Sequence, residues 1–144
     1  MPFSAVNQDF RHMKNKDLGL LLIRLAVGIL LLMHGINKIF HGIEGVKNTI
    51  GDTGIPELFA YGVYIGEVIA PLMLALGLRT RIASLLVCAN MLVIIFIAHP
   101  GDIFSLSGSG AWELELQGLY LLGSLGLFFT GGGKYALSSG NRWD

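Results

Sequence analysis

Residues 18–40, LGLLLIRLAVGILLLMHGINKIF, form a long apolar stretch that constrains the fold more than any other part of the chain. About 20 mostly apolar residues are enough for a helix to cross a bilayer, so this stretch predicts a membrane-spanning helix. It also carries four polar residues, Arg24, His34, Asn37 and Lys38. Because a charged side chain is costly at membrane depth, we expect these groups to face protein or a wet cavity and to have partners.

The composition supports a membrane protein. Hydrophobic residues make up 53% of the 144 residues and charged residues 14%, whereas a soluble domain has about 25% charged residues. The formal net charge of 0 indicates no basic surface for nucleic acid. The single cysteine, Cys88, cannot form a disulfide within the chain, and we expect it to be a packing residue. Residues 1–17 show no cleavable signal pattern, so the first helix is expected to be retained.

Four apolar runs predict four spans, at residues 18–40, 58–78, 82–98 and 114–130. Helices are the only open-chain way to satisfy the backbone in lipid. The expected fold is therefore all-α, an integral-membrane antiparallel four-helix bundle, with residues 1–144 forming a single membrane domain. The first outer loop places Ile43, Val46 and Ile50 at helical spacing, which predicts a short helix lying in the membrane interface.

The distribution of lysine and arginine predicts the orientation. One side collects most of the basic residues, namely Arg11, Lys14, Lys16, Arg79, Arg81, Lys134 and Arg142. The other side has only Lys38 and Lys47. Both termini of this multi-pass chain are therefore expected to be cytoplasmic.

A first polar layer is predicted near the membrane centre. At a rise of 1.5 Å per residue, Arg24 lies about 9 Å and Glu67 about 16 Å from the cytoplasmic side. An extended arginine can cover the difference of about 7 Å, so we expect Arg24 and Glu67 to form a buried ion pair. Asn90 is expected to hydrogen-bond this pair. Pro71 removes the helical donor for the Glu67 carbonyl and predicts a kink there. The pair is either structural or a proton-carrying or ligand-anchoring site.

A second polar layer is predicted near the outer surface. His34, His99 and Gln117 fall about 24–27 Å from the cytoplasmic side by the same rise. The full set of candidate ligand-binding residues in this layer is His34, Lys38, His99, Glu113, Gln117 and Tyr120. Asn90 and His99 would point to opposite sides of a straight helix, so we expect the third helix to fray before Pro100.

This outer layer admits several interpretations. A quinone head group needs paired polar contacts beside an apolar slot, and a proton relay needs the same histidine and carboxylate groups. The layer could equally consist of solvated helix ends. No third fixed ligand accompanies the histidines, so neither a metal nor a haem is expected, and the cofactor stays open with quinone as the candidate.

Small residues predict close helix packing. Gly28, Gly35 and Gly42 recur every seven residues in the first span, and Gly62 and Gly66 share a face of the second. Such ridges also suggest a homo-oligomer or a partner protein held against them.

The stretch RLAVGILLLMHGINKIF resembles the first helix of the DoxX family of small four-helix membrane proteins. The resemblance continues through Gly54–Ile55–Pro56, Glu67, LALGLRTRIASLL, the pair Met91 and His99, the acidic start of the fourth span and GGGKYALS. It implies an inner-membrane protein associated with redox systems, because the family name comes from a thiosulfate:quinone oxidoreductase subunit. Other relatives resemble accessory, maturation or chaperone proteins, so membership does not fix an activity.

Three hypotheses follow. The first is a subunit of a quinone-linked oxidoreductase system, in which His34 and Lys38 hold a head-group oxygen, Glu113 and His99 carry protons, and Arg24 and Glu67 lock the bundle. The second is a non-catalytic membrane assembly, chaperone or small-molecule-binding protein. The third is a small proton-coupled carrier.

Overall fold

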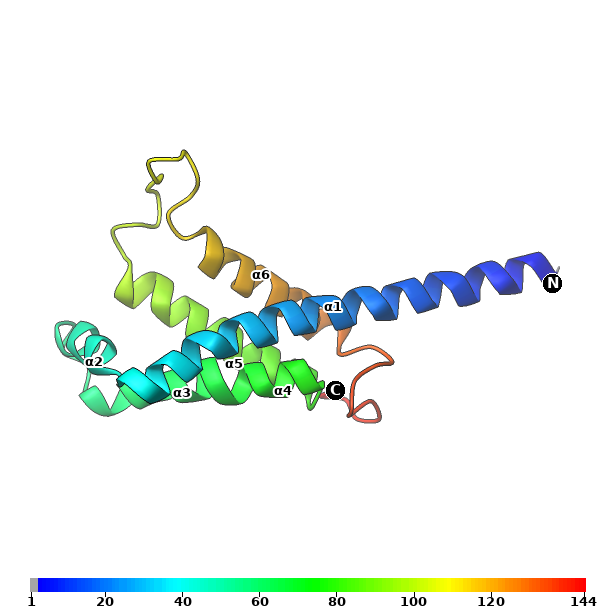
Figure 1. Cartoon of the computed structure of the whole chain (residues 1–144), viewed down its shortest axis with the longest axis horizontal. Helices are drawn as coiled ribbons and strands as arrows, with labels where there is room; N and C mark the ends of the chain where they lie inside the picture. Colours follow the sequence, from blue (N-terminus) through cyan, green and yellow to red (C-terminus); the bar gives the residue numbers. More distant parts are fainter. Residues whose placement is uncertain (1–2) are drawn as a thin grey trace.

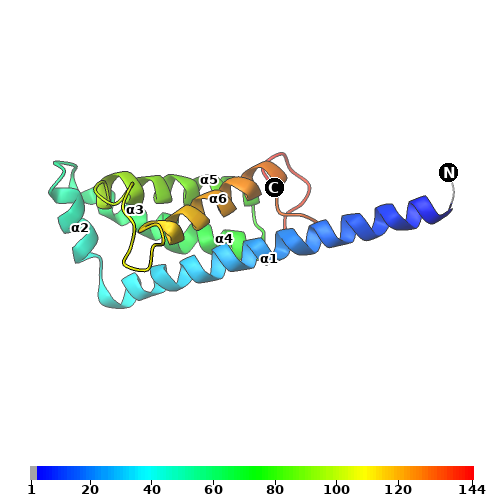
Figure 2. The same cartoon turned by 90° about the horizontal axis from the view of Figure 1, so that it is seen from above.

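The computed structural model describes residues 3–144, with side chains described for residues 15–144. Helices dominate this part of the chain, which contains no β-strand beyond an isolated bridge between Leu106 and Trp112. The first helix, α1, runs Phe3–His41 and extends beyond the other helices at its N-terminal end (Figures 1 and 2). Arg11 and Lys14, which were counted for the orientation, lie outside the residues whose side chains are described.

The second apolar run is one helical stretch with changing pitch. It consists of a 3₁₀ segment, a short α segment, a π segment and a final α segment: η1 (Glu57–Tyr61), α3 (Gly62–Tyr64), η2 (Ile65–Ile69) and α4 (Ala70–Leu76). The third run is α5 (Thr80–Val93) followed by the π segment η3 (Ile94–Ala98). The fourth run is α6 (Glu115–Thr130).

Three helical stretches are long and apolar enough to cross a membrane, namely Asn15–His41, Glu57–Leu76 and Thr80–Ala98. The first three predicted spans are therefore confirmed as helices of spanning length. The fourth run is helical where expected, but α6 has 16 residues, fewer than the roughly 20 that cross a bilayer without adjustment. A membrane bundle of four spanning helices stays a prediction.

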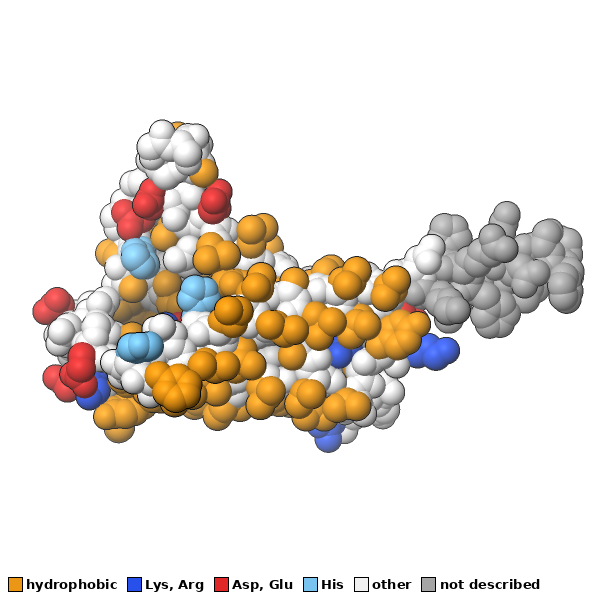
Figure 3. All heavy atoms as spheres, viewed as in Figure 1, with side chains coloured by type: hydrophobic (Ala, Val, Ile, Leu, Met, Phe, Trp, Pro, Cys, Tyr) orange, Lys and Arg blue, Asp and Glu red, His pale blue; other side chains and the backbone are white. Residues whose placement is uncertain are grey.

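The helices pack around a shared apolar core. α6 lies against α5 and α1, and α4 lies against α1 and α5. Leu31, Leu74, Val87, Met91 and Leu127 are almost completely buried between them. Large apolar side chains also cover the outside of the helices (Figure 3). An apolar surface of this extent suits lipid rather than water, because soluble monomers rarely expose such large patches.

Two glycines bring α1 into close contact with the second apolar run. A Cβ built on Gly28 would lie 2.7 Å from the Pro71 carbonyl oxygen, and one on Gly35 would lie 2.1 Å from the Glu67 carbonyl oxygen. A side chain at either position would collide with backbone, so glycine is required for this approach. Gly28 and Gly35 therefore pack within the chain, whereas a Cβ on Gly42 or Gly62 would meet nothing within 4 Å. A homo-oligomer stays a prediction.

The short helix predicted in the first outer loop is present as α2 (Glu44–Gly51). Its apolar face does not face outward, because Ile43 and Ile50 are buried against Ala60 and Val63. The expected interfacial face is therefore used for internal packing. The helix forms a wall at one end of the molecule, beside η1 and η3 (Figure 2).

Candidate functional site

The predicted ion pair between Arg24 and Glu67 is wrong. Arg24 is 1% exposed and donates instead to main-chain carbonyls. Its Nε bonds the Leu74 oxygen at 3.0 Å and its Nη1 bonds the Gly132 oxygen at 2.8 Å, while Nη2 reaches the oxygens of Ala75 at 3.2 Å and Tyr135 at 3.5 Å. The last carbonyls of a helix lack intrahelical donors, so the guanidinium completes the end of α4 and holds the C-terminal segment to it.

The register of the helices explains the error. Gly35, and not Arg24, lies against the Glu67 carbonyl. Gly35 is about 16 Å farther along α1 than Arg24 at 1.5 Å per residue, too far for an arginine to reach. The depth estimate aligned the ends of the apolar runs, whereas the glycine contacts set the actual alignment of α1 with the second run.

Glu67 pairs with Lys38. The Lys38 Nζ lies 2.5 Å from the Glu67 Oε2, with the carboxylate side chain 4% exposed and the lysine side chain 26% exposed. Lys38 lies almost one turn beyond Gly35 on α1, so its side chain needs to reach back only a short way. An ion pair with a buried carboxylate is tolerated when geometry is good and the partner is close. Lys38 is thus the ion-pair partner of the buried Glu67 carboxylate.

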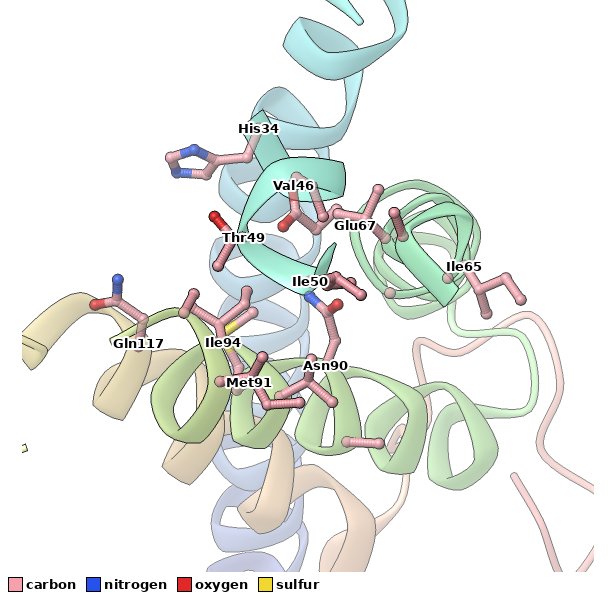
Figure 4. A pocket seen from close by; sticks show the side chains of 18 of the residues that line it. His34, Val46, Thr49, Ile50, Ile65, Glu67, Asn90, Met91, Ile94 and Gln117 are labelled. Atoms are coloured by element: carbon pink, nitrogen blue, oxygen red, sulfur yellow. The ribbon is translucent and has the colours of Figure 1, made fainter. Parts of the chain in front are cut away.

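The ion pair borders a cavity of about 620 Å³ between the helices. That volume is typical of small-molecule sites. Most of the lining is apolar, and the polar lining residues are His34, Lys38, Thr49, Glu67, Asn90, His99, Gln117 and Tyr120. Glu67 and Asn90 extend into the same space from neighbouring helices (Figure 4). The surface is visibly hollowed beside histidine side chains at this end of the molecule (Figure 3).

Two π segments shape this cavity. η2 contains Glu67 and immediately precedes the turn with Pro71, which cannot donate to the Glu67 carbonyl. η3 follows α5, and the His99 N–H donates to the Ile94 carbonyl, five residues back. A π turn holds an extra residue per turn, which rotates His99 toward the side that carries Asn90. Both residues line the cavity, so the third helix ends in a wide turn and not in a frayed one.

Five of the six residues predicted for the outer layer surround this cavity. His34 packs edge to face with Tyr120 at a ring-centroid distance of 6.3 Å, and the His99 Nδ1 lies 3.0 Å from the Asp102 carboxylate. The sixth residue, Glu113, is exposed and lies outside the cavity lining. The structure therefore does not bring Glu113 together with the other five.

The sequence argument missed the contribution of the first outer loop. Thr49, Val46 and Ile50 of α2 line the cavity, together with Phe59 and Ala60 of η1. The signal was available, because the helical spacing in α2 marks an apolar face that needs a partner. We predicted that this face lies in the membrane interface, but it forms part of the cavity wall.

The C-terminal segment closes the opposite end. The Asp144 carboxylate accepts hydrogen bonds from the Ser138 hydroxyl and from the backbone N–H groups of Asn141 at 2.6 Å and Gly140 at 2.9 Å. Arg79 lies 3.6 Å from the same carboxylate. These contacts, the Ser138 bond first, hold the pKa of Asp144 below its ordinary value. With Arg24, they join this segment to the turn between α4 and α5.

Together, the apolar exterior, the spanning helices and the mostly apolar cavity with a few polar groups define a small helical membrane protein with a ligand-sized site between its helices. The model of the DoxX family matches residues 19–100. The chain belongs to the DoxX family.

Two curated relatives match most of the chain. A protein of Bacillus subtilis (strain 168) named "Putative oxidoreductase CatD" is 32% identical over 124 residues, covering 86% of this chain and 87% of that protein. An uncharacterized protein of Haemophilus influenzae (strain ATCC 51907 / DSM 11121 / KW20 / Rd) is 30% identical over 123 residues, covering 83% and 88%. No solved structure matches the chain.

Proposed function

We propose that this chain is an inner-membrane subunit associated with an oxidoreductase system, and that its cavity holds the head group of a quinone. The observation that carries the proposal is an apolar cavity of about 620 Å³ with a lysine–glutamate pair at its edge. The name of the Bacillus relative, an oxidoreductase, supports the redox association. A bound quinone would supply two-electron redox chemistry.

The residues present fit such a group. The Lys38 ammonium is a hydrogen-bond donor for a quinone carbonyl, and Glu67 holds that ammonium in place. His34 and Tyr120, whose rings pack edge to face, offer aromatic surface in the same cavity. The apolar lining from α2 and η3 accepts the ring and the beginning of a tail.

The proposed topology has four membrane-spanning helices with both termini cytoplasmic. Lys16, Arg79, Arg81, Lys134 and Arg142 lie on the side that is proposed to be cytoplasmic. Asp and Glu side chains gather at the opposite end, around α2 and the loop before α6 (Figure 3). The cavity then opens toward the outer half of the bilayer. α6 spans with the help of local bilayer thinning, which costs only fractions of a kcal/mol per Å.

Quinone binding tests the proposal. Menadione is partitioned by equilibrium dialysis between protein-containing and empty detergent micelles. We expect binding by the wild type, weaker binding by His34→Ala and by the double variant Lys38→Met/Glu67→Gln, and unchanged binding by Asn37→Ala. Asn37 is the matched control, because it is exposed on α1 and does not line the cavity. The double variant removes both charges at once, so no lone charge stays buried.

Equal menadione retention by wild-type protein and empty micelles would end the quinone hypothesis. Equal binding by the wild type and by both cavity variants would show that menadione does not bind at the Lys38–Glu67 pair.

A further inference from the structure

Four buried side-chain atoms lack a hydrogen-bond partner among the described residues: Thr80 Oγ1, Ser84 Oγ, Asn90 Nδ2 and Ser124 Oγ. Three of them are hydroxyls that pack in the helical core and do not line the cavity. Asn90 differs, because its side chain lines the cavity beside Glu67. An amide N–H that is buried without a partner costs free energy, and this one belongs to a side chain in the wall of the cavity.

Gly66 holds this amide in place. A Cβ built on Gly66 would lie 2.3 Å from the Asn90 Cγ, 2.4 Å from its Cβ and 2.5 Å from its Oδ1. The amide therefore lies flat on the glycine, in space that any other residue would fill. Oδ1 is the nearer of the two terminal amide atoms to Gly66, because Nδ2 is not among the three nearest atoms. Figure 4 shows the Asn90 amide extending from α5 toward Glu67 and Ile50.

Two charged groups lie near this donor. The Lys38 ammonium gives one N–H to Glu67 at 2.5 Å and keeps its other N–H groups for the ligand. An ionised Glu67 carboxylate only accepts hydrogen bonds, and so it cannot bind a carbonyl oxygen. An amide N–H is suited to such an oxygen and does not change its charge with pH.

We infer that Asn90 is the residue that selects for a carbonyl-bearing ligand, with its Nδ2 donating to a carbonyl oxygen of the bound molecule. This inference rests on the proposed function, since it places a second donor on the ligand that Lys38 contacts. The ligand then reaches past the ion pair to the level of Gly66. An apolar ring of the same shape that lacks carbonyl groups gains nothing from Asn90.

A matched pair of ligands tests this selectivity. Menadione has two carbonyl groups, and methylnaphthalene keeps its rings and methyl group without them. Dissociation constants for both are measured on the detergent-solubilised full chain for wild type, Asn90→Leu, Asn90→Ala and Ser84→Ala. Ser84 is the control, because it also has an unpartnered buried atom on α5 but lies outside the cavity lining.

We expect both Asn90 variants to bind menadione about fivefold more weakly, the effect of one neutral hydrogen bond. Methylnaphthalene binding should stay unchanged or become tighter. The infrared carbonyl stretch of bound menadione should be lowered in the wild type and in Ser84→Ala, and Asn90→Ala should lose the part of that shift that Lys38 does not cause. Circular dichroism melting identifies a variant that has not folded, in which case the shift that persists in the double variant Lys38→Met/Glu67→Gln decides.

The outcomes separate this inference from the proposed function. If the wild type binds menadione and the Asn90 variants keep the same preference for it over methylnaphthalene, Asn90 is satisfied by water and the inference fails alone. A wild-type carbonyl stretch equal to that in free solution would likewise overturn it. If the wild type binds no menadione, the proposed function and the inference fail together.

Discussion

Replacing Arg24 by methionine should destabilise the protein and release its C-terminal segment. Methionine is similar in length and keeps the apolar stem, but it has no donors. The substitution therefore removes the bonds from the guanidinium to Leu74 at 3.0 Å and Gly132 at 2.8 Å, and the longer bonds to Ala75 and Tyr135. Four carbonyls that converge on one side chain lose their donor together.

The magnitude follows from the two shorter bonds. A hydrogen bond from a charged donor contributes about 1.5–3 kcal/mol, so two of them contribute roughly 3–6 kcal/mol. Methionine is cheaper to bury than a guanidinium, which offsets part of that loss. We expect a net loss of about 3 kcal/mol in the free energy of unfolding. Arg24→Lys, which keeps the charge but loses the planar fork, should fall between wild type and Arg24→Met.

Unfolding is followed by circular dichroism in mixed micelles with increasing dodecyl sulfate. A second measurement is the rate of trypsin cleavage after Lys134, which should rise in Arg24→Met because the segment that holds it loses its anchor. Lys16→Met is the control, since it makes the same kind of change at an exposed position on the same helix. Unfolding midpoints that coincide for Arg24→Met and Lys16→Met would refute the assignment of Arg24 as the anchor.

Three further predictions concern other contacts. Gly35→Ala should destabilise the protein, because the added methyl group would meet the Glu67 carbonyl. Gly19→Ala, whose methyl group would have nothing within 4 Å, should be neutral or stabilising. Equal melting temperatures for the two variants would contradict the close contact. Lys38→Met alone should cost about 3 kcal/mol by stranding the Glu67 carboxylate, and adding Glu67→Gln should recover much of that in the same melt; no recovery would argue against the pair. The pKa of Asp144 is lowered by its hydrogen bonds, so the stability it contributes is present above its ordinary pKa of 3.8 and is lost as pH falls through the lowered value. This pH dependence is measured as resistance to trypsin cleavage before and after acid exposure. Asp144→Asn should lose the dependence, and a pH profile equal to that of the wild type would exclude Asp144 as its source.

The positions of the helices could be predicted from the sequence because apolar length and composition are local properties. The boundary of α6 at Glu115 and the end of η3 before Pro100 follow from charges, prolines and apolar runs that can be located directly in the chain. The helix α2 was predicted in the same way, from the spacing of Ile43, Val46 and Ile50. Each of these features depends on neighbours within a few turns of one helix.

The pairing of the charges could not be predicted because it depends on the relative height of two helices. Counting residues from the ends of the apolar runs placed Glu67 beside Arg24, an error of about three helical turns. The close contacts at Gly28 and Gly35 fix that height, and the sequence shows the glycines without showing which partner they meet. The π segment around Glu67 changes the phase of its side chain further.

The cavity was predicted in part. The clustering of His34, His99, Gln117 and Tyr120 followed from their similar depth. Glu113 was predicted to join them, but it lies in the turn before α6 and is exposed outside the lining, because depth alone says nothing about the direction of a side chain.

The surroundings of Arg24 and Lys38 support a structural role for Arg24 and the proposed binding role for Lys38. Arg24 is 1% exposed, and the carbonyls of the chain surround its donors, so it has no freedom to meet a ligand. Lys38 is 26% exposed at the edge of a cavity, and the carboxylate beneath it is 4% exposed. A ligand can approach that ammonium without unfolding anything, and in doing so it competes with one ion pair and not with a network of main-chain bonds. The chemistry of this protein should therefore be sought at Lys38 and Glu67, while Arg24 keeps the other end of the bundle closed.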